Sequence, residues 1–332
     1  MNSSISASDR RWRRLLARYA LWTILLGTAL IALLLGLDPY DTGRLTPLPS
    51  FGVPNFGQRL AFASIGRRAD ADAAIIGNST IQLLDPARLS KLSGDRVVSL
   101  AIPGTGPLEQ IAVAEWFRRH HPGTTFKGLA LGLDTSWCAT DAKLEPAYPF
   151  PFWLYSPNAL DYAVHLMRYQ SFEAAARKVK LMLGLAAPAR EDGYHDYDSG
   201  QVWDGELLRQ LPPPPTASAS PPARKADFVA AKLLTDFLAK LDGTTRVVLL
   251  FVPRYGKTLP LPGSPAAAHE AECKAAFQAV AAARRRTIVL DWLVDNALVR
   301  KDENFWDGVH YGAAIARLLE DATAVELAGA QR

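Results

Sequence analysis

Residues 73–80 read AAIIGNST, a short apolar run that ends in a turn at Gly77-Asn78-Ser79. Four adjacent apolar residues next to a glycine turn are typical of a strand that is buried on both faces. Residues 81–92 then repeat apolar side chains at helical spacing. We therefore predict a strand, a tight turn and a helix.

The same order of strand and helix recurs along the rest of the chain. Further strands are predicted at residues 96–102, 128–133, 246–252 and 287–292. Helices are predicted at residues 107–120, 226–241 and 266–285, and after the last strand. Strands that alternate with helices form parallel sheets covered by helices on both faces. The prediction is one domain at residues 71–325, a flavodoxin-like three-layer α/β/α sandwich with about five parallel strands.

Residues 140–224 interrupt this alternation. The stretch is rich in Phe, Trp and Tyr and ends in a segment dominated by Pro, Ser and Ala. Such a composition predicts an insertion that closes with a flexible surface loop. Its aromatic side chains either form a small core of their own, which we favour, or offer stacking surfaces to sugar rings.

The N-terminal part of the chain predicts a membrane anchor. Residues 19–37 carry no formal charge and are long enough to cross the hydrocarbon core. Five arginines lie in the segment 1–18, so the positive-inside rule predicts a cytoplasmic N-terminus in a bacterial inner membrane. Residues 38–70 would then be a Pro- and Gly-rich tether to a periplasmic domain. A cleaved signal peptide is the alternative, although its apolar region is normally shorter and followed by a small-residue cleavage site.

Composition excludes several classes of protein. Hydrophobic residues make up 49% of the chain and charged residues 21%, so a large core is expected and general disorder is not. The net charge of +4 comes mainly from the N-terminal arginines, and Arg284-Arg285-Arg286 fits the polar end of a helix, so no nucleic-acid surface is predicted. With two cysteines and no ligand cluster, we expect no metal and no other cofactor. Cys138 and Cys273 either form a disulfide in an oxidising compartment or remain two buried thiols, and we favour the thiols.

Ser79 is the first candidate catalytic residue. It follows a predicted parallel strand, and ligands bind at the carboxyl ends of such strands. Its hydroxyl can project from the turn as a nucleophile while its own N–H contributes to an oxyanion hole. The simpler interpretation is a serine that only caps the following helix.

The segment FWDGVHY, residues 305–311, places Asp307 three residues before His310. The pair lies between the last predicted strand and the last predicted helix, so it too can reach the carboxyl edge of the sheet. Asp307 can hold one ring nitrogen of His310 while the other accepts the proton of a hydroxyl. Together with Ser79, the segment predicts a Ser–His–Asp triad.

These blocks resemble the SGNH hydrolase superfamily. Its members have a serine in a GDS-like block after the first strand and a DxxH block near the end, which correspond here to GNS at residues 77–79 and DGVH at residues 307–310. The family's second block is a glycine after the second strand whose N–H enters the oxyanion hole, and Gly104 matches it. The resemblance implies that Ser79 is the nucleophile and that the N–H groups of Ser79 and Gly104 form the oxyanion hole.

Two positions depart from the family pattern. Asn78 replaces the aspartate that usually precedes the serine, and Asp134 stands where the third block usually has an asparagine. A carboxylate cannot donate a hydrogen bond, so Asp134 is predicted to weaken the oxyanion hole unless it is protonated or turned away. Departures of this kind from the usual block sequences resemble the membrane-associated branch of the superfamily. Its members O-acetylate alginate and other exopolysaccharides or D-alanylate teichoic acids. That resemblance implies a polytopic membrane partner that delivers the acyl group.

Four residues are candidates for substrate binding. Asn78, Asp134, Arg254 and Tyr255 each follow the end of a predicted strand, and FVPRY at residues 251–255 also looks like a Val-Pro segment of the same branch. Arg254 suits the carboxylate of a uronic-acid polymer, or it simply faces solvent in a loop.

Three classes of function remain open. The first is an extracytoplasmic serine O-acyltransferase that acts on a cell-envelope or secreted polysaccharide. The second is a carbohydrate or lipid esterase with the same triad, in which water rather than a sugar hydroxyl resolves the acyl-enzyme. The third is a non-catalytic module that binds glycan or a partner, which Asp134 favours and which predicts that Ser79→Ala changes nothing.

Overall fold

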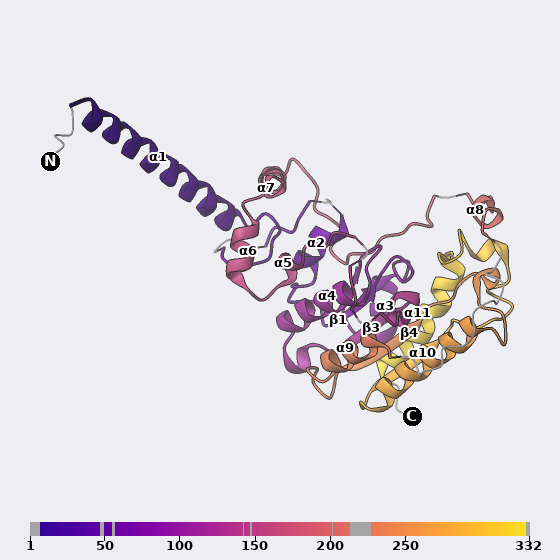
Figure 1. Ribbon diagram of the computed structural model, residues 1–332. Helices are drawn as coiled ribbons and strands as arrows, with labels where there is room; N and C mark the ends of the chain where they lie inside the picture. Colours follow the sequence, from indigo (N-terminus) through magenta and orange to yellow (C-terminus); the bar gives the residue numbers. More distant parts are fainter. Residues whose placement is uncertain are drawn as a thin grey trace. The chain divides into compact units, whose positions relative to one another are not determined.

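The computed structural model describes residues 7–46, 50–54, 57–141, 143–146, 148–200, 202–212 and 227–329. The chain divides into two compact units. The first, here called the anchor unit, comprises residues 1–54 and 156–188, and contains the long helix α1 (Ala7–Leu37) (Figure 1). The second, the sheet unit, comprises residues 55–155 and 189–332 and contains the whole β-sheet.

The sheet unit is built on five parallel strands, as the sequence predicts. They are β1 (Ala73–Gly77), β2 (Val97–Ala101), β3 (Gly128–Leu133), β4 (Arg246–Phe251) and β5 (Thr287–Asp291). Their order across the sheet is β2-β1-β3-β4-β5, and every neighbouring pair is parallel. This is the strand order of flavodoxin-like sheets. The predicted α/β class with a parallel five-stranded sheet is confirmed.

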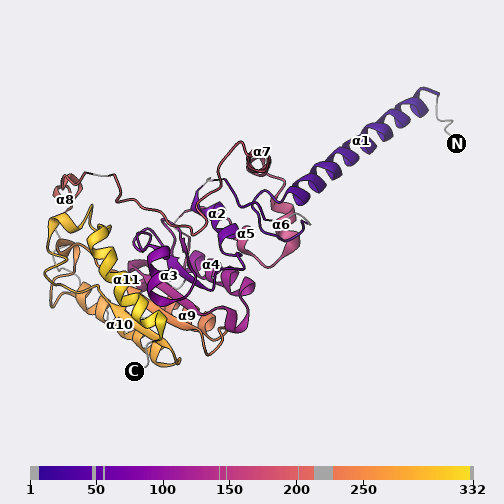
Figure 2. The ribbon, with the colours of Figure 1, turned by 180° about the vertical axis from the view of Figure 1, so that it is seen from behind.

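Helices cover both faces of this sheet (Figures 1 and 2). The helices that contact its strands are α2 (Gln58–Ile65), α3 (Pro86–Ser93), α4 (Pro107–His120), α10 (Pro265–Ala282) and α11 (Ala313–Ala328), and α9 (Val229–Leu238) packs beside α4 and α10. Successive residues of a strand point to opposite faces. Leu250 joins the core cluster that includes α11 residues, whereas the ring centroid of Phe251 lies 6.0 Å from that of Phe277 in α10. Thus α3 and α11 cover one face, and α4, α9 and α10 cover the other.

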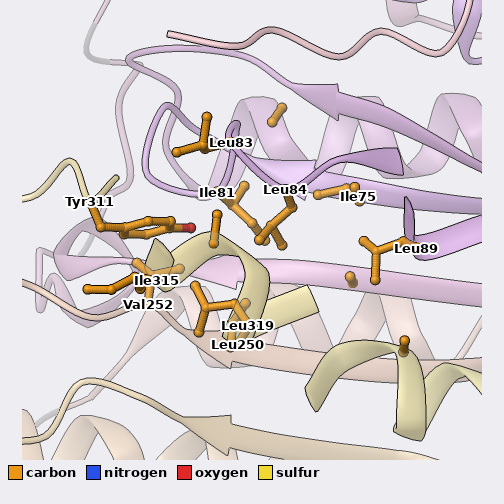
Figure 3. Close-up of a cluster of buried hydrophobic side chains, with 14 of the residues drawn as sticks. Ile75, Ile81, Leu83, Leu84, Leu89, Leu250, Val252, Tyr311, Ile315 and Leu319 are labelled. Carbon is orange, nitrogen blue, oxygen red and sulfur yellow. The ribbon is translucent and has the colours of Figure 1, made fainter. Parts of the chain in front are cut away.

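The face beneath α3 and α11 holds a large apolar core, drawn in Figure 3. Its fully buried members include Ile75, Ile81, Leu84, Leu89, Leu250, Ile315 and Leu319. They come from strands, helices and the turn after β1. The segment around Ser79 is therefore held in place by the same core that packs against the sheet.

Glu320 of α11 is buried beside this core, with 0% of its surface exposed. Its carboxylate accepts the backbone N–H of Asp85 at 2.7 Å and pairs with Arg88 and Arg317 at 3.2 and 3.0 Å. Burial outweighs these favourable contacts and raises the pKa of Glu320 to about 7.

We expect Glu320 to make the sheet unit less stable as the pH rises. The folded state holds the proton of Glu320 up to a pKa of about 7, whereas the unfolded chain releases it near the ordinary value of 4.5. Between these values the unfolded state binds fewer protons, so the free energy of unfolding should fall with pH, by up to about 3 kcal/mol. Urea titrations across this window measure the slope. Glu320→Gln cannot ionise and should flatten it, and an unchanged slope in that variant would contradict the assignment.

The helix predicted at residues 81–92 begins later than expected. α3 starts at Pro86, and Asp85 caps it by accepting the backbone N–H of Ala87 at 2.9 Å. Proline has a fixed φ and no N–H to donate, so it suits the first helical turn and sets the start there. The helix is therefore capped by Asp85, and the interpretation of Ser79 as an N-cap residue is not supported.

The anchor unit contains α1, α6 (Ala159–His165) and α7 (Tyr169–Met182). Among the residues that the structure describes, α1 is the one helix long and apolar enough to cross a membrane. The candidate span runs from Arg10 to Leu37 and includes the anchor predicted at residues 19–37. α7 packs against α1 within this unit.

Parts of residues 38–70, predicted to be a tether, are packed. Directly after α1, Asp38, Tyr40 and Asp41 are buried in the anchor unit. In the sheet unit, the last five residues of α2 (Gln58–Ile65) are buried. The sequence does not predict this packing, because the first three residues bond to partners more than a hundred positions away and show no local period.

The predicted insertion at residues 140–224 does not form one separate subdomain. Residues 156–188 belong to the anchor unit, whereas the stretches before and after them belong to the sheet unit with α5 (Phe152–Tyr155) and α8 (Glu206–Arg209). Its aromatic residues are divided in the same way, so they do not share one small core. The Pro-, Ser- and Ala-rich segment falls mainly at residues 213–226, outside the described residues.

Cys138 and Cys273 form a disulfide, with Cα atoms 5.5 Å apart. Our preference for two free thiols is therefore wrong. Cys138 ends the short 3-10 turn that follows β3, and Cys273 lies in α10, so the bond ties a loop at the carboxyl edge of the sheet to the helix layer. The two cysteines are 135 residues apart, and only the fold brings them together.

Candidate active site

Ser79 lies just beyond the end of β1, at the carboxyl edge of the sheet. β1 has β2 on one side and β3 on the other, so the order of connections reverses at this strand. Ligands of open α/β sheets bind at such switch points, because the loops on the two sides diverge and leave a crevice. The fold therefore puts Ser79 at the position where this class of sheet holds its ligands.

Ser79, His310 and Asp307 are brought into contact. The Oγ of Ser79 lies 2.8 Å from Nε2 of His310, and Nδ1 of His310 lies 2.7 Å from Oδ2 of Asp307. Ser79 and His310 are 231 residues apart in sequence. In this arrangement Asp307 favours the imidazole tautomer with its proton on Nδ1, which leaves Nε2 able to accept the proton of Ser79.

Hydrogen bonds hold Asp307 as a carboxylate. Its Oδ1 accepts the backbone N–H groups of Val309 and His310, each at 2.8 Å. Burial raises the pKa of Asp307, but the hydrogen bonds from the His310 ring and these two N–H groups outweigh it, so the pKa lies below its ordinary value. Asp307 therefore stays ionised near neutral pH, as a group that orients and stabilises an imidazolium must.

A segment that sequence reasoning missed supports the loop that carries His310. The ring of Tyr197 meets the ring of His310 edge-on, with centroids 5.6 Å apart, and its hydroxyl donates to the backbone oxygen of Tyr311 at 3.0 Å. The carboxylate of Asp198 accepts the backbone N–H of Ala313 at 3.0 Å, at the start of α11. A carboxylate there stabilises the helix N-terminus. Aromatic-rich composition was the only available signal for this segment.

Gly104 follows β2, whose end is level with the end of β1. Its φ of +65° favours glycine, and a Cβ at this position would lie 2.9 Å from the ring of Tyr148. Among the described residues, the backbone N–H groups of Ser79 and Gly104 donate to no other protein group. Both donors therefore remain available to an oxyanion.

Asn78 and Asp134 contact each other. Nδ2 of Asn78 donates to Oδ2 of Asp134, across the loops that follow the neighbouring strands β1 and β3. Oδ1 of Asp134 accepts the N–H and the hydroxyl of Ser136, at 3.0 and 2.5 Å. Both oxygens of Asp134 are thus engaged by donors. The amide of Asn78 and the carboxylate of Asp134 therefore form one hydrogen-bonded pair.

We expect Asn78→Asp to lower both stability and activity. The substitution sets a second carboxylate against Asp134 and removes a donor, which costs about 1 to 3 kcal/mol in the free energy of unfolding. Adding Asp134→Asn to the same chain restores an amide–carboxylate pair with the two positions exchanged, and should recover most of the loss. Urea titration and the rate of ester cleavage measure the two effects. A double variant no better than Asn78→Asp would show that the contact does not matter.

A pocket of about 660 Å³ opens beside Asn78, and neither Ser79 nor His310 is among the residues that line it. The loops after β1, β2 and β3 line it through Asn78, Gly104 and Asp134, and Asn78 directly precedes Ser79. The charged residues that line it are Asp134, Asp141, Lys143 and Glu145. The volume is within the range of small-molecule sites, about 300 to 1,000 Å³. The pocket therefore has room for one or two sugar rings and carries more carboxylates than amines.

Arg254 and Tyr255 do not line this pocket. Tyr255 is completely buried, and its hydroxyl donates to the carboxylate of Asp302 at 2.5 Å. Arg254 donates to the backbone oxygen of Thr258 at 2.9 Å, and burial lowers the pKa of Arg254. Of the four predicted substrate-binding residues, only the other two lie in the pocket.

No protein-family model matches the chain, and no curated protein matches it in sequence. The candidate site therefore rests on its geometry. Within the described part of the chain, no group of three or more His, Cys, Asp or Glu side chains could hold a metal ion.

Proposed function

We propose that this chain is an SGNH-type serine O-acyltransferase, anchored in a bacterial inner membrane, that acylates hydroxyl groups of a polysaccharide outside the cytoplasm. One observation carries the proposal: the imidazole of His310 lies between the hydroxyl of Ser79 and the carboxylate of Asp307, at 2.8 and 2.7 Å. A serine bonded in this way to an oriented imidazole is the arrangement that activates a hydroxyl for acyl transfer.

In the first half-reaction, Nε2 of His310 takes the proton of Ser79 as Oγ attacks the carbonyl carbon of an acyl donor. The negative charge that forms on the carbonyl oxygen is met by the N–H groups of Ser79 and Gly104. The intermediate collapses to an acyl-enzyme, and His310 gives its proton to the leaving group. Asp307 stabilises the imidazolium through both steps.

In the second half-reaction, a sugar hydroxyl replaces the leaving group. His310 takes the proton of that hydroxyl as its oxygen attacks the acyl-enzyme, and returns the proton to Oγ of Ser79 when the new ester departs. Transfer rather than hydrolysis is favoured by the pocket of about 660 Å³ beside Asn78, which can hold an acceptor against the acyl-enzyme. Carboxylates outnumber amines in that lining, so a neutral sugar fits better than the uronic acid considered for Arg254.

Two features support a location outside the cytoplasm. The arginines of residues 1–18 precede the uncharged run 19–37, which favours a cytoplasmic N-terminus. The disulfide between Cys138 and Cys273 suits an oxidising compartment. A donor must then reach the site from the cytoplasm, so we propose a polytopic membrane partner that passes the acyl group across, as the family resemblance implies.

The test is to trap the acyl-enzyme and follow its fate. The full chain in detergent is mixed with p-nitrophenyl acetate, quenched in acid, and its peptides are weighed by mass spectrometry. We expect a burst of nitrophenol and an acetyl group on the peptide that contains Ser79. Neutral oligosaccharides should then shorten the life of the acyl-enzyme and gain the acetyl group. An acyl-enzyme that reacts with water but not with the oligosaccharides would indicate an esterase. If Ser79 is not acylated by esters of several acyl lengths, the chain would instead be a non-catalytic binding module.

A further inference from the structure

A buried polar cluster lies directly after α1 in the anchor unit. The amine of Lys178 is 1% exposed and donates to the carboxylate of Asp41 at 3.0 Å and to the backbone oxygen of Asp38 at 2.8 Å. The hydroxyl of Tyr162 donates to the carboxylate of Asp38 at 2.7 Å. Lys178 lies in α7 and Tyr162 in α6, so the cluster fastens both helices to the residues that follow α1.

The side chains that α7 buries are small or polar, whereas exposed large side chains lie at its two ends and directly after it. The buried residues of α7 are Ser171, Ala174, Ala175 and Lys178. In α7 and directly after it, the exposed large residues are Tyr169, Val179, Leu183 and Leu185, of which three are more than 60% exposed. A surface helix of a soluble domain normally turns its apolar side chains toward the core. The exposed middle of α7 is polar and carries the Glu173–Arg177 ion pair, so the unpartnered apolar surface is limited to Tyr169 and to residues 179–185.

The place where α7 packs along α1 indicates how close α7 lies to the membrane surface. The side chains of residues 10–26 are exposed, whereas Leu34 is buried and residues 35–37 are half-buried, so only the last part of α1 is covered. The uncharged run 19–37 is about 28 Å long at about 1.5 Å per residue, close to the hydrocarbon thickness of about 30 Å. Leu34 then lies within one turn of the membrane surface, and α7 packs near it.

We propose that the lipid bilayer covers this apolar surface, so that Tyr169 and residues 179–185 form a second, interfacial membrane contact beside the spanning helix. An apolar face at this depth binds the boundary between headgroups and acyl chains. Tyr169 suits the same zone, where aromatic side chains are enriched, and the exposed Arg168 and Lys180 suit anionic headgroups. This contact would hold the anchor unit against the membrane, and it does not depend on the triad.

The test measures lipid contact residue by residue in the full chain. Single cysteines are introduced by Val179→Cys and Leu183→Cys, with the native disulfide intact, and labelled with a small fluorophore. The protein is reconstituted without any other protein into vesicles of phosphatidylethanolamine and phosphatidylglycerol. The vesicles contain a phospholipid with a nitroxide near the headgroup end of its acyl chain. Leu26→Cys in α1 serves as the lipid-exposed control, and Val325→Cys, on α11 and 52% exposed, as the matched control outside the anchor unit.

We expect the nitroxide lipid to remove at least half as much fluorescence at Val179 and Leu183 as at Leu26, and almost none at Val325. Iodide in the buffer should quench in the reverse order. If Val179 and Leu183 behave like Val325, the bilayer does not cover this surface and the proposal is overturned. A surface that binds a protein partner instead of lipid would also behave like Val325, because the vesicles contain no partner protein.

Discussion

Ser79→Ala is expected to lower kcat/KM for an activated ester by about 10⁴-fold or more. The substitution removes the atom that we propose forms the acyl-enzyme, and leaves His310 and Asp307 bonded to each other. Ser79 lies in a turn outside α3, and its hydroxyl caps no helix, so the fold should survive its loss. Steady-state cleavage of p-nitrophenyl acetate by the full chain, with near-ultraviolet circular dichroism as a check of folding, measures the effect.

His310→Ala should cost about as much as Ser79→Ala, and the double variant should be no worse than either one. Residues that act as a unit show this non-additivity, because removing one disables the others. His120, which bonds to Trp116 at the end of α4, supplies a matched control: His120→Gln should keep normal activity. Losses that simply multiply in the double variant would mean that Ser79 and His310 act independently, which the contact of 2.8 Å argues against.

The parts of the fold that the sequence predicted are those with local patterns. Each of the five strands is a short apolar run, and the helix at residues 107–120 has a proline in its first turn and occurs as predicted. The sequence also predicts which residues lie at the carboxyl edge of the sheet, because the loop after each parallel strand begins there. These residues are Ser79, Gly104 and the 307–310 block. The sequence could not predict that the side chains of Ser79, His310 and Asp307 lie within hydrogen-bond distance, because this depends on how α11 packs against the sheet.

The parts that the sequence did not predict depend on contacts between distant residues. Asp41 and Lys178 are 137 positions apart, and each looks like an ordinary surface charge in the sequence. Asp198 reads as a loop residue until α11 is placed beside it. Asn78 and Asp134 are 56 positions apart, and only the fold brings them into one hydrogen-bonded pair. Local periodicity carries no information on any of these contacts.

Removing the disulfide is expected to have the largest effect on stability. Cys138→Ser with Cys273→Ser releases a closed loop of 135 residues in the unfolded chain, which on the loop-entropy model lowers the free energy of unfolding by about 5 kcal/mol. Urea titration of the full chain in detergent, followed by tryptophan fluorescence, should show the midpoint falling with little change in slope. Reduction of the wild-type chain should produce a similar fall, whereas the double variant should not respond to reductant.

The same variant also tests whether the bond serves the site. Cys138 lies between Ser136 and Ala139, which both line the pocket beside Asn78, and its partner Cys273 is held in α10. If the bond positions this loop, KM for an acceptor sugar should rise at urea concentrations where the variant is still folded, while the burst at Ser79 persists because the triad residues lie on other loops. A fall in stability with an unchanged KM would assign the disulfide to stability alone. A fall in the burst itself would instead mean that β3 and its loop hold the nucleophile turn, through the contact of Asp134 with Asn78.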